Sequence, residues 1–443
     1  MRMKKILILI FGLMAYNHGV AQSYTLEQLK DSALCHNIRI RDAQHDMEAA
    51  RQQRMEAFTK YFPNISGTGL WFNANRGMME TGITPSEVLP SSFAQMLPTE
   101  GLALLAEPVH VSMMKRGIIA GVSAVQPLFA GGQIVYGNKL ARVGEEVSRL
   151  QLHYSENEVR KTVEQYFWNL VSMSEKMKTN DAVEVMLDDI YKNVEVAVKA
   201  GVAMPNDLLQ VQLRQNETES NKLKLMNELG FVKHLLAQYC GLCDTSFILS
   251  YQTEELPLVA VKQDHAQALL HTVEYQLLDK QVEAAGFQKK MAVGQNLPTI
   301  AMGAGYNYHN LLDNDHKFGM IFATVSVPIS DWWGGSHAIK RKKIEYQKAV
   351  EQMENHSDML KIRMQKAWND VNESYRQLVI SYRSIEQAKE NLRLNYNYYE
   401  AGISKMSDLL EAQLLYQQAC DKRTDAFAAY QNKLLEYRQS IGD

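Results

Sequence analysis

The sequence predicts a mainly α-helical protein with a transmembrane β part, built from a duplicated unit of helix, β-hairpin, long helix and helix. Three observations support this class. The stretch KAGVAMPNDLLQVQ at 199–212 returns in similar form as EAGISKMSDLLEAQ at 400–413. Two proline-free spans of roughly 65 residues carry a helical pattern. Each half also contains two short runs that are typical of β-strands.

The first residues indicate a secretory signal peptide at 1–21. Arg2, Lys4 and Lys5 precede the apolar run ILILIFGLMA, and Gly19-Val20-Ala21 offers small residues for cleavage before Gln22. A membrane anchor is the alternative, but this run is nearer ten residues than the roughly twenty that a spanning helix needs. Cleavage would change the formal charge from −3 to about −6, with both signs mixed along the chain. A nucleic-acid partner is therefore not expected.

The four cysteines do not form a convincing redox or metal motif. Cys240 and Cys243 have the CxxC spacing, but no second Cys or His pair lies at zinc spacing and no βαβ pattern surrounds them. We expect either a structural disulfide or inert thiols at these positions. No cysteine follows the cleavage site, so a lipid anchor is not expected.

The sequence does not favour an enzyme, and no cofactor or metal is expected. The 12 histidines are scattered without an HExxH spacing, and the glycines match neither a dinucleotide-binding motif nor a P-loop. The basic run Lys340–Lys343 could contact acidic lipid head groups. A solvated helix face explains this run as well.

The repeat predicts the domain organisation. Gly201 and Gly402, Asp207 and Asp408, and Pro127 and Pro328 are paired at one constant offset. We predict a first repeat at 22–241, a linker at 242–261 and a second repeat at 262–443. The first repeat carries an insertion between Pro63 and Pro127, and its four prolines, Pro85, Pro90, Pro98 and Pro108, favour a long loop.

Each half is expected to contain the same elements in the same order. The first is a helix of roughly 35 residues, at about 25–61 and about 262–296. Strands follow at about 63–73 and 117–127 in the first half, and at about 298–308 and 319–328 in the second. Long helices then cover about 134–199 and 336–400. After each repeated turn, a helix of roughly 35 residues closes the half.

The long helices are predicted to pack as coiled coils. Apolar residues recur every seven positions in the second half: Val371, Leu378, Ile385, Leu392 and Tyr399. An ordinary helix-bundle core is the alternative for any single one of them. At 1.5 Å per residue, a helix of about 65 residues spans roughly 100 Å, the length of two stacked helices of about 35. Each half therefore predicts a rod with a turn at one end and a β-hairpin at the other.

The hairpins indicate a membrane and an oligomer. Ile300, Met302 and Tyr306 alternate with Gly303 and Gly305, which gives one apolar face and one small, polar face. A lone hairpin is barely stable in water, whereas this dyad pattern fits a transmembrane barrel. Because the smallest bacterial barrels use about eight strands, several chains must contribute: three would give twelve strands and four would give sixteen.

Trp332 and Trp333 follow the last strand directly, where an interfacial aromatic belt would place them. A buried anchor in a soluble protein explains this pair equally well.

Through the junctions QPLFAGGQI and VPISDWWGGSH and the Gly-x5-Asp turns, the mature chain resembles the TolC-like outer-membrane efflux factor family. The resemblance implies a homotrimer with a 12-stranded barrel in the outer membrane, continued by a periplasmic α-helical barrel. It implies a passive exit duct for a tripartite (multidrug) efflux pump or a type I secretion system. The implied partners are a periplasmic adaptor (membrane fusion) protein, an inner-membrane transporter and outer-membrane lipid. The cargo would be selected largely by the pump.

The resemblance also implies site residues at the repeated turns. Gly201 and Gly402 match the tips at which the adaptor docks. Asp207 and Tyr399 match a closed-state gate, and Asp408 and Glu411 match an acidic ring at the pore entrance. Where the best-known member has arginine, this chain has Ser404, with Lys405 next to it, which leaves the usual gate bonds open.

Independent physical arguments bear on these carboxylates. Asp408 and Glu411 lie three residues apart on one helix face, and a threefold axis would gather six carboxylates. Such a ring would favour cations. A helix N-terminus also favours aspartate, which gives Asp207 and Asp408 a local alternative role.

Two other protein classes remain possible. A soluble periplasmic coiled-coil adaptor or scaffold protein would explain the signal peptide, the heptads and the tips, but not the four strands. An exported hydrolase would need a catalytic constellation that the sequence does not contain.

Overall fold

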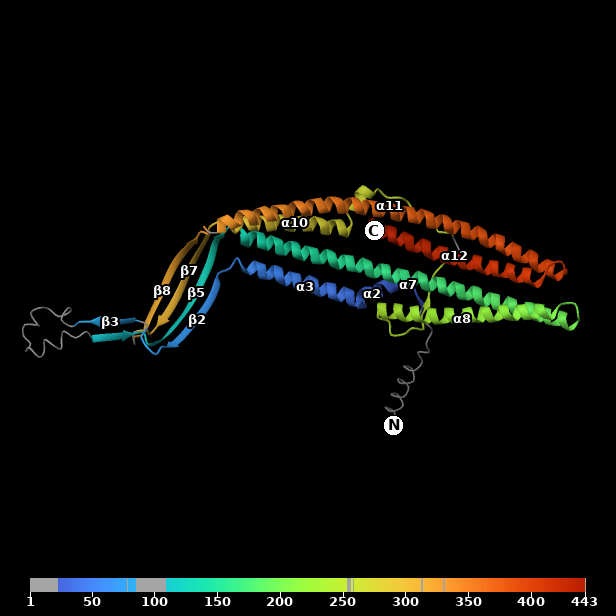
Figure 1. Ribbon diagram of the computed structural model, residues 1–443, viewed down its shortest axis with the longest axis horizontal. Helices are drawn as coiled ribbons and strands as arrows, with labels where there is room; N and C mark the ends of the chain where they lie inside the picture. Colours follow the sequence, from blue (N-terminus) through green and yellow to red (C-terminus); the bar gives the residue numbers. More distant parts are fainter. Residues whose placement is uncertain are drawn as a thin grey trace, which may run out of the picture. The chain divides into compact units, whose positions relative to one another are not determined.

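The computed structural model describes residues 23–77, 79–84, 109–252, 256–257, 259–311, 314–329 and 331–442. The predicted signal peptide and the four prolines of the insertion lie outside these residues. The chain divides into two compact units. We call them the helical unit (1–50, 145–282 and 349–443) and the sheet unit (51–144 and 283–348), and the long helices contribute residues to both (Figure 1).

The helices largely follow the predicted order. The first repeat has α2 (Leu26–His36), α3 (Ile38–Thr59), α7 (Gln133–Lys199) and α8 (Pro205–Cys240). The second repeat has α9 (His265–Leu269), α10 (Val273–Gly294), α11 (Asp331–Glu400) and α12 (Met406–Ser440). The two long helices contain 67 and 70 residues. The predicted fold class, mainly helical with a small β part, is confirmed.

The first helix expected in each half is broken in two, which corrects the prediction. Asn37 is extended between α2 and α3, and its side chain donates to the carbonyl of Tyr239 at 3.1 Å. In the second half, residues 270–272 separate α9 from α10. A distant carbonyl therefore stabilises a break that the local helical pattern does not reveal.

At each break, the backbone packs against a glycine that follows the last helix of the same repeat. Gly241, after α8, has φ +69°, and a Cβ at this position would collide with the side chain of His36. Gly442, after α12, has φ +82°, and a Cβ there would lie 3.2 Å from the carbonyl oxygen of His271. Glycine is needed both for the left-handed backbone and for the close approach.

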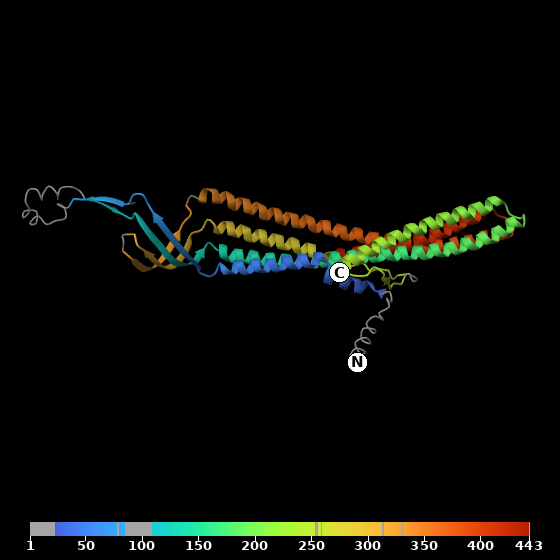
Figure 2. The same cartoon turned by 90° about the horizontal axis from the view of Figure 1, so that it is seen from below.

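Three apolar clusters form the core of the helical unit. The first joins α2, α7 and α8 around Leu29, Phe167 and Leu236, and the second joins α11 and α12 around Leu378 and Tyr430. The third cluster contains residues of both repeats and lies next to the two repeated turns. In Figure 2 the turns α7–α8 and α11–α12 lie at the same end of this unit.

Of the heptad residues, Val371, Leu378 and Leu392 are buried, as a coiled-coil seam requires. Full burial of one such side chain contributes about 1.5–3 kcal/mol.

A short parallel sheet pairs the first described residues with the segment that was predicted to be a linker. Strand β1 (Ser23–Tyr24) pairs with β6 (Ile248–Leu249), and Phe247 beside it is buried in the first cluster. All four cysteines are free thiols, so of the two expected alternatives the structure has the unpaired thiols and not the disulfide. Burial raises the pKa of the Cys240 thiol to about 12, which keeps this thiol protonated and unreactive.

The sheet unit contains one antiparallel sheet of four strands in the order β2-β5-β7-β8. These are β2 (Asn64–Asn73), β5 (Arg116–Ala130), β7 (Thr299–His309) and β8 (His316–Ser326). Figure 1 shows them side by side. The insertion is not loop throughout, because β3 (Met79–Ile83) pairs with β4 (Val109–Met113) inside it. None of the helices in the described ranges combines the length and apolar character needed to cross a membrane.

The strand register gives the sheet two different faces. We call one the apolar face; its large exposed apolar residues are Ile65, Trp71, Ile118, Val122, Ile300, Met302, Tyr306, Ile321 and Val325. The opposite, mixed face carries Ser66, Ser123, Asn307, several glycines and the aromatic rings of β8. Phe322 fits on the mixed face because Gly303 is its cross-strand partner, where a Cβ would collide with the Phe322 ring.

The strand-to-helix junctions are close-packed. Gly131 has φ +60°, and a Cβ there would overlap the carbonyl of Gly294 at the end of α10. In the second repeat, the indole N–H of Trp332 donates to the carbonyl of Asn296 at 3.0 Å. Trp332 is therefore anchored by a hydrogen bond to the backbone.

Candidate functional site: the helix-hairpin tips

Both repeated turns end their helix with a left-handed glycine. Gly201 has φ +75° and donates to the carbonyl of Val198 at 3.0 Å; Gly402 has φ +69° and donates to the carbonyl of Tyr399 at 2.9 Å. No atom lies within 4 Å of a Cβ built on either glycine. The backbone angle, rather than lack of space, therefore requires glycine at both tips.

The two aspartates of the tips cap the helices that follow. Asp207 accepts a hydrogen bond from the backbone N–H of Met204 at 3.1 Å, and Asp408 accepts one from that of Lys405 at 3.2 Å. Each carboxylate thus satisfies a free backbone donor near the positive end of a helix dipole. Helix capping is the local role that the sequence analysis gave as the alternative for Asp207 and Asp408. A capping carboxylate can still contribute its charge to a pore entrance.

The environments of the two aspartates differ. Asp207 is half-buried and Asp408 is exposed. Burial and the negative charge of Asp207 together raise the pKa of the Tyr399 hydroxyl. The structure therefore brings Asp207 of the first helical hairpin (α7–α8) near Tyr399 of the second helical hairpin (α11–α12). Tyr399 also packs against the third apolar cluster, which includes Val194, Val211 and Met406.

Asp408 and Glu411 lie on the exposed side of α12, one helical turn apart. Within the described residues, Glu411 has neither an ion pair nor a hydrogen bond, whereas the hydroxyl of Ser407 donates to Asp408 at 3.2 Å. Two neighbouring carboxylates on one exposed surface would produce a negative field. A ring, however, requires other chains.

Ser404 bonds only within its own hairpin. Its hydroxyl lies 3.5 Å from the carbonyl of Asn395 on α11, a long and weak contact. Ser404 therefore does not replace an arginine that would reach the first hairpin.

A different arginine joins the two hairpins, and the sequence analysis missed it. Arg214 of α8 donates through Nε to Oε1 of Gln413 at 3.0 Å and through a terminal nitrogen to Oε1 of Gln417 at 2.7 Å, both on α12. Its other terminal nitrogen donates to Glu217 at 3.0 Å. Gln413 is fully buried and Gln417 nearly so. The sequence offered one signal for this contact: Gln413 and Gln417 are four residues apart and therefore lie on one face of the predicted helix.

A second bridge lies further from the tips. Lys176 of α7 pairs with Asp425 of α12 at 2.6 Å, and the hydroxyl of Ser172 donates to the same carboxylate at 3.0 Å. One turn earlier on α12, Asp421 is half-buried. Burial, opposed by Lys176 and reinforced by Asp425, raises the pKa of the Asp421 carboxyl to about 6.

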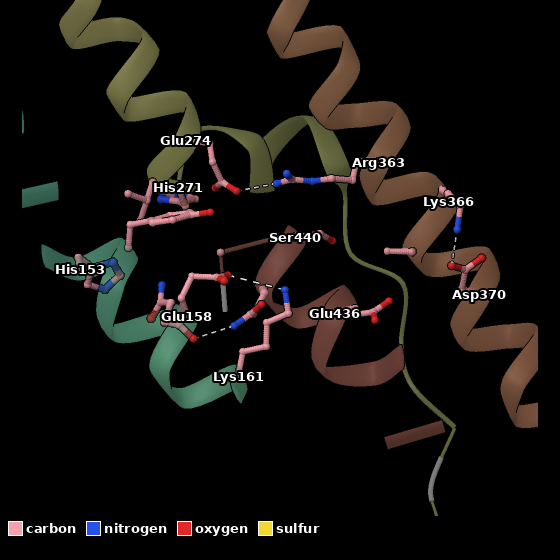
Figure 3. A pocket seen from close by; sticks show the side chains of 16 residues that line it. His153, Glu158, Lys161, His271, Glu274, Arg363, Lys366, Asp370, Glu436 and Ser440 are labelled. Atoms are coloured by element: carbon pink, nitrogen blue, oxygen red, sulfur yellow. Dashed lines mark hydrogen bonds and ion pairs between the residues drawn. The ribbon is translucent and has the colours of Figure 1, made fainter. Parts of the chain in front are cut away.

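The helical unit also contains a charged cavity of about 330 Å³ between α7, α10, α11 and α12 (Figure 3). Its charges pair with one another: Arg363 with Glu274 at 2.6 Å, Lys366 with Asp370 at 2.6 Å, and Lys161 with Glu158 at 3.7 Å. A further lining carboxylate, Glu436, pairs with Lys433 outside the lining at 2.7 Å. The described residues contain no group of three or more His, Cys, Asp or Glu that could hold a metal ion.

Proteins with a similar sequence or fold are known. Residues 266–443 match the model of a family described as outer membrane efflux protein. The solved structure of the outer membrane protein VceC from Vibrio cholerae is similar with a TM-score of 0.74 and 14% identity, covering 94% of this chain and 96% of VceC.

Two further solved channels are similar. The CmeC outer membrane channel of Campylobacter jejuni has a TM-score of 0.75 and 16% identity, with 94% of this chain and 85% of CmeC covered. The open state of the MtrE outer membrane channel of Neisseria gonorrhoeae has a TM-score of 0.73 and 16% identity, with coverages of 94% and 88%. No curated protein sequence matches the chain.

Proposed function

We propose that this protein is an outer-membrane exit duct, because residues 266–443 match the outer membrane efflux protein family and the fold is similar to that of solved outer-membrane channels. It would serve a tripartite efflux pump or a type I secretion system as a passive conduit from the periplasm to the exterior. Three copies would assemble into a 12-stranded barrel continued by periplasmic helices. The partners would be a periplasmic adaptor protein and an inner-membrane transporter.

The sheet carries this proposal. Its apolar face exposes large side chains, among them Trp71 (70% exposed) and Ile321 (82% exposed). Exposing such an apolar surface to water is unfavourable, whereas lipid chains solvate it. Strands β2 and β8 are the edges of the sheet, and their outer backbone groups need partners that a lipid environment cannot supply. Three four-stranded sheets joined edge to edge would satisfy these groups in twelve strands.

The tips would form the periplasmic entrance. A threefold axis would gather the exposed Asp408 and Glu411 of three chains into a ring of six carboxylates, which would favour cations. Gly201 and Gly402 would present the turns to the adaptor, since their backbones are bare of side chains. Asp207 and Tyr399 would hold the two hairpins of one chain together near the closed entrance.

The competing proposal, a soluble periplasmic adaptor or scaffold, leaves the exposed apolar face unexplained. The decisive experiment is fractionation followed by a mass measurement. We expect the protein in the outer membrane, extracted by detergent as a particle with three times the chain mass, and forming ion-conducting pores in planar bilayers. Recovery as a soluble periplasmic monomer would contradict the duct, and a fourfold mass would favour sixteen strands over twelve.

A further inference from the structure

Two histidines face each other across the last hairpin of the sheet unit. His309 ends β7 and His316 begins β8, and they are direct partners in the strand register. Both side chains therefore lie on the mixed face, since opposite residues of an antiparallel pair share a face. Their ring centroids are 5.3 Å apart, with 31° between the ring planes.

This separation suits two imidazoles that bind one ion. With about 2.0 Å from each ring nitrogen to the metal and a tetrahedral angle between the two bonds, the ring centroids would lie about 5 Å apart. As direct cross-strand partners, the two histidines are held opposite each other by a paired backbone, so little backbone freedom is lost when the ion binds.

A second observation points to a ligand. Nδ1 of His309 is buried and has no hydrogen-bond partner among the described residues. A buried polar atom without a partner costs about 1–3 kcal/mol, and a metal ion would remove that cost. Phe318 lies edge-on to His309 at 6.1 Å between centroids, so one side of the pair is apolar.

Among the residues that the structure describes around this hairpin, which exclude 312 and 313, the two histidines are the protein ligands of the site. The nearby carboxylate of Asp315 accepts a hydrogen bond from the hydroxyl of Tyr308 at 2.7 Å, and Tyr308 belongs to the apolar face. Two imidazoles favour Zn²⁺, Ni²⁺ or Cu²⁺ over Mg²⁺ or Ca²⁺, which prefer oxygen ligands.

We propose that His309 and His316 bind one divalent transition-metal ion through their imidazole nitrogens, with water completing its coordination. The site goes beyond the exit-duct function, which needs no metal. With open water positions the ion exchanges readily, so the site would bind free metal ions rather than hold a structural one.

The test is a titration of the detergent-purified protein, prepared without a polyhistidine tag, with ZnCl2 and with CuCl2. We expect one site per chain, tighter for Cu²⁺ than for Zn²⁺, and a Cu²⁺ spectrum with splitting from two nitrogens. His316→Ala and His309→Gln should each weaken binding at least about tenfold, because one fixed imidazole is lost. The control is His356→Ala, an exposed histidine of α11, which should leave the affinity unchanged.

The proposal is overturned if His316→Ala binds as tightly as the unmodified protein, or if the double variant His309→Gln/His316→Ala retains the site. None of these measurements uses channel activity, so a negative result would leave the exit-duct proposal untouched.

Discussion

Nε of Arg214 in the first repeat donates to Oε1 of Gln413 in the second at 3.0 Å, and the arginine side chain is only 12% exposed. The guanidinium also reaches Gln417, so a single side chain ties α8 to two turns of α12. The repeats are not equivalent here, because the position that matches Arg214 in the second repeat is Leu415. The two helical hairpins are therefore joined by a hydrogen bond that has no counterpart at the matching position of the other repeat.

Arg214→Ala should loosen the two hairpins. It leaves the buried amide oxygen of Gln413 without a donor, which costs about 1–3 kcal/mol in the free energy of unfolding. If the tips form the entrance, the variant should also show larger or more frequent openings in planar bilayers. Arg214→Lys should recover only part of the effect, because an ammonium group cannot make the two-pronged contact.

The matched control for Arg214 is Arg393→Ala. Arg393 is exposed on α11 and pairs with Glu390 of the same helix at 2.8 Å. This change should alter stability and conductance little. Equal effects of the two arginine substitutions would argue against a hairpin bridge.

Gly201→Ala and Gly402→Ala should each lower stability by about 1–2 kcal/mol, because alanine resists the positive φ of both turns. The measurement is thermal or urea unfolding. Gly230→Ala is the control: Gly230 lies within helix α8 with open space around its Cα, so alanine there should raise stability by about 0.5–1 kcal/mol. A loss at Gly230 as large as at the tips would refute the backbone argument.

Asp408→Asn combined with Glu411→Gln should lower cation selectivity without unfolding the tip. Asparagine can still accept the hydrogen bond from the Lys405 N–H, so the cap survives while the charge is removed. The readout is the reversal potential under a salt gradient. Glu351→Gln, an exposed change on α11, is the control, and a reversal potential that stays the same in the double variant would exclude the acidic ring.

Asp421→Asn should stabilise the protein at pH 7.5 but not at pH 4. The pKa of the Asp421 carboxyl is raised to about 6 in the fold, above its ordinary value of about 3.9. The folded protein then holds this proton more tightly than the unfolded chain. Stability from this group therefore falls as pH rises from about 4 to about 6 and is constant above that.

Unfolding in urea across this pH range tests the assignment. The gain from Asp421→Asn at pH 7.5 should reach about 1–2 kcal/mol after allowance for partial exposure. The exposed control Glu386→Gln should show no such pH-dependent difference. A gain from Asp421→Asn that is equal at both pH values would mean that its charge is not the cause.

Local patterns were sufficient for much of this fold. The tip glycines and aspartates followed from a repeated phrase, and the two faces of β7 followed from alternation, since both are written in neighbouring residues. The aromatic ring of Phe322 on the mixed face departs from this alternation, and it is accommodated by Gly303 on the neighbouring strand β7. Only the strand register shows that pairing.

Features that depend on distant partners were missed. The break at Asn37 relies on a carbonyl 202 residues away, and the Arg214 bridge spans 199 residues to Gln413. The β3–β4 pair lay within a segment whose prolines favoured a loop. In each case the local sequence is compatible with several structures, and a tertiary contact selects one.

The glycines that close each repeat, Gly241 and Gly442, act through backbone geometry alone. They contribute no side chain to the contact, so the way in which each repeat folds back on its own beginning depends on keeping these two positions free of a Cβ. They suggest a practical route to chimaeras, in which one repeat is exchanged for that of a protein of similar fold by joining the chains immediately after such a glycine.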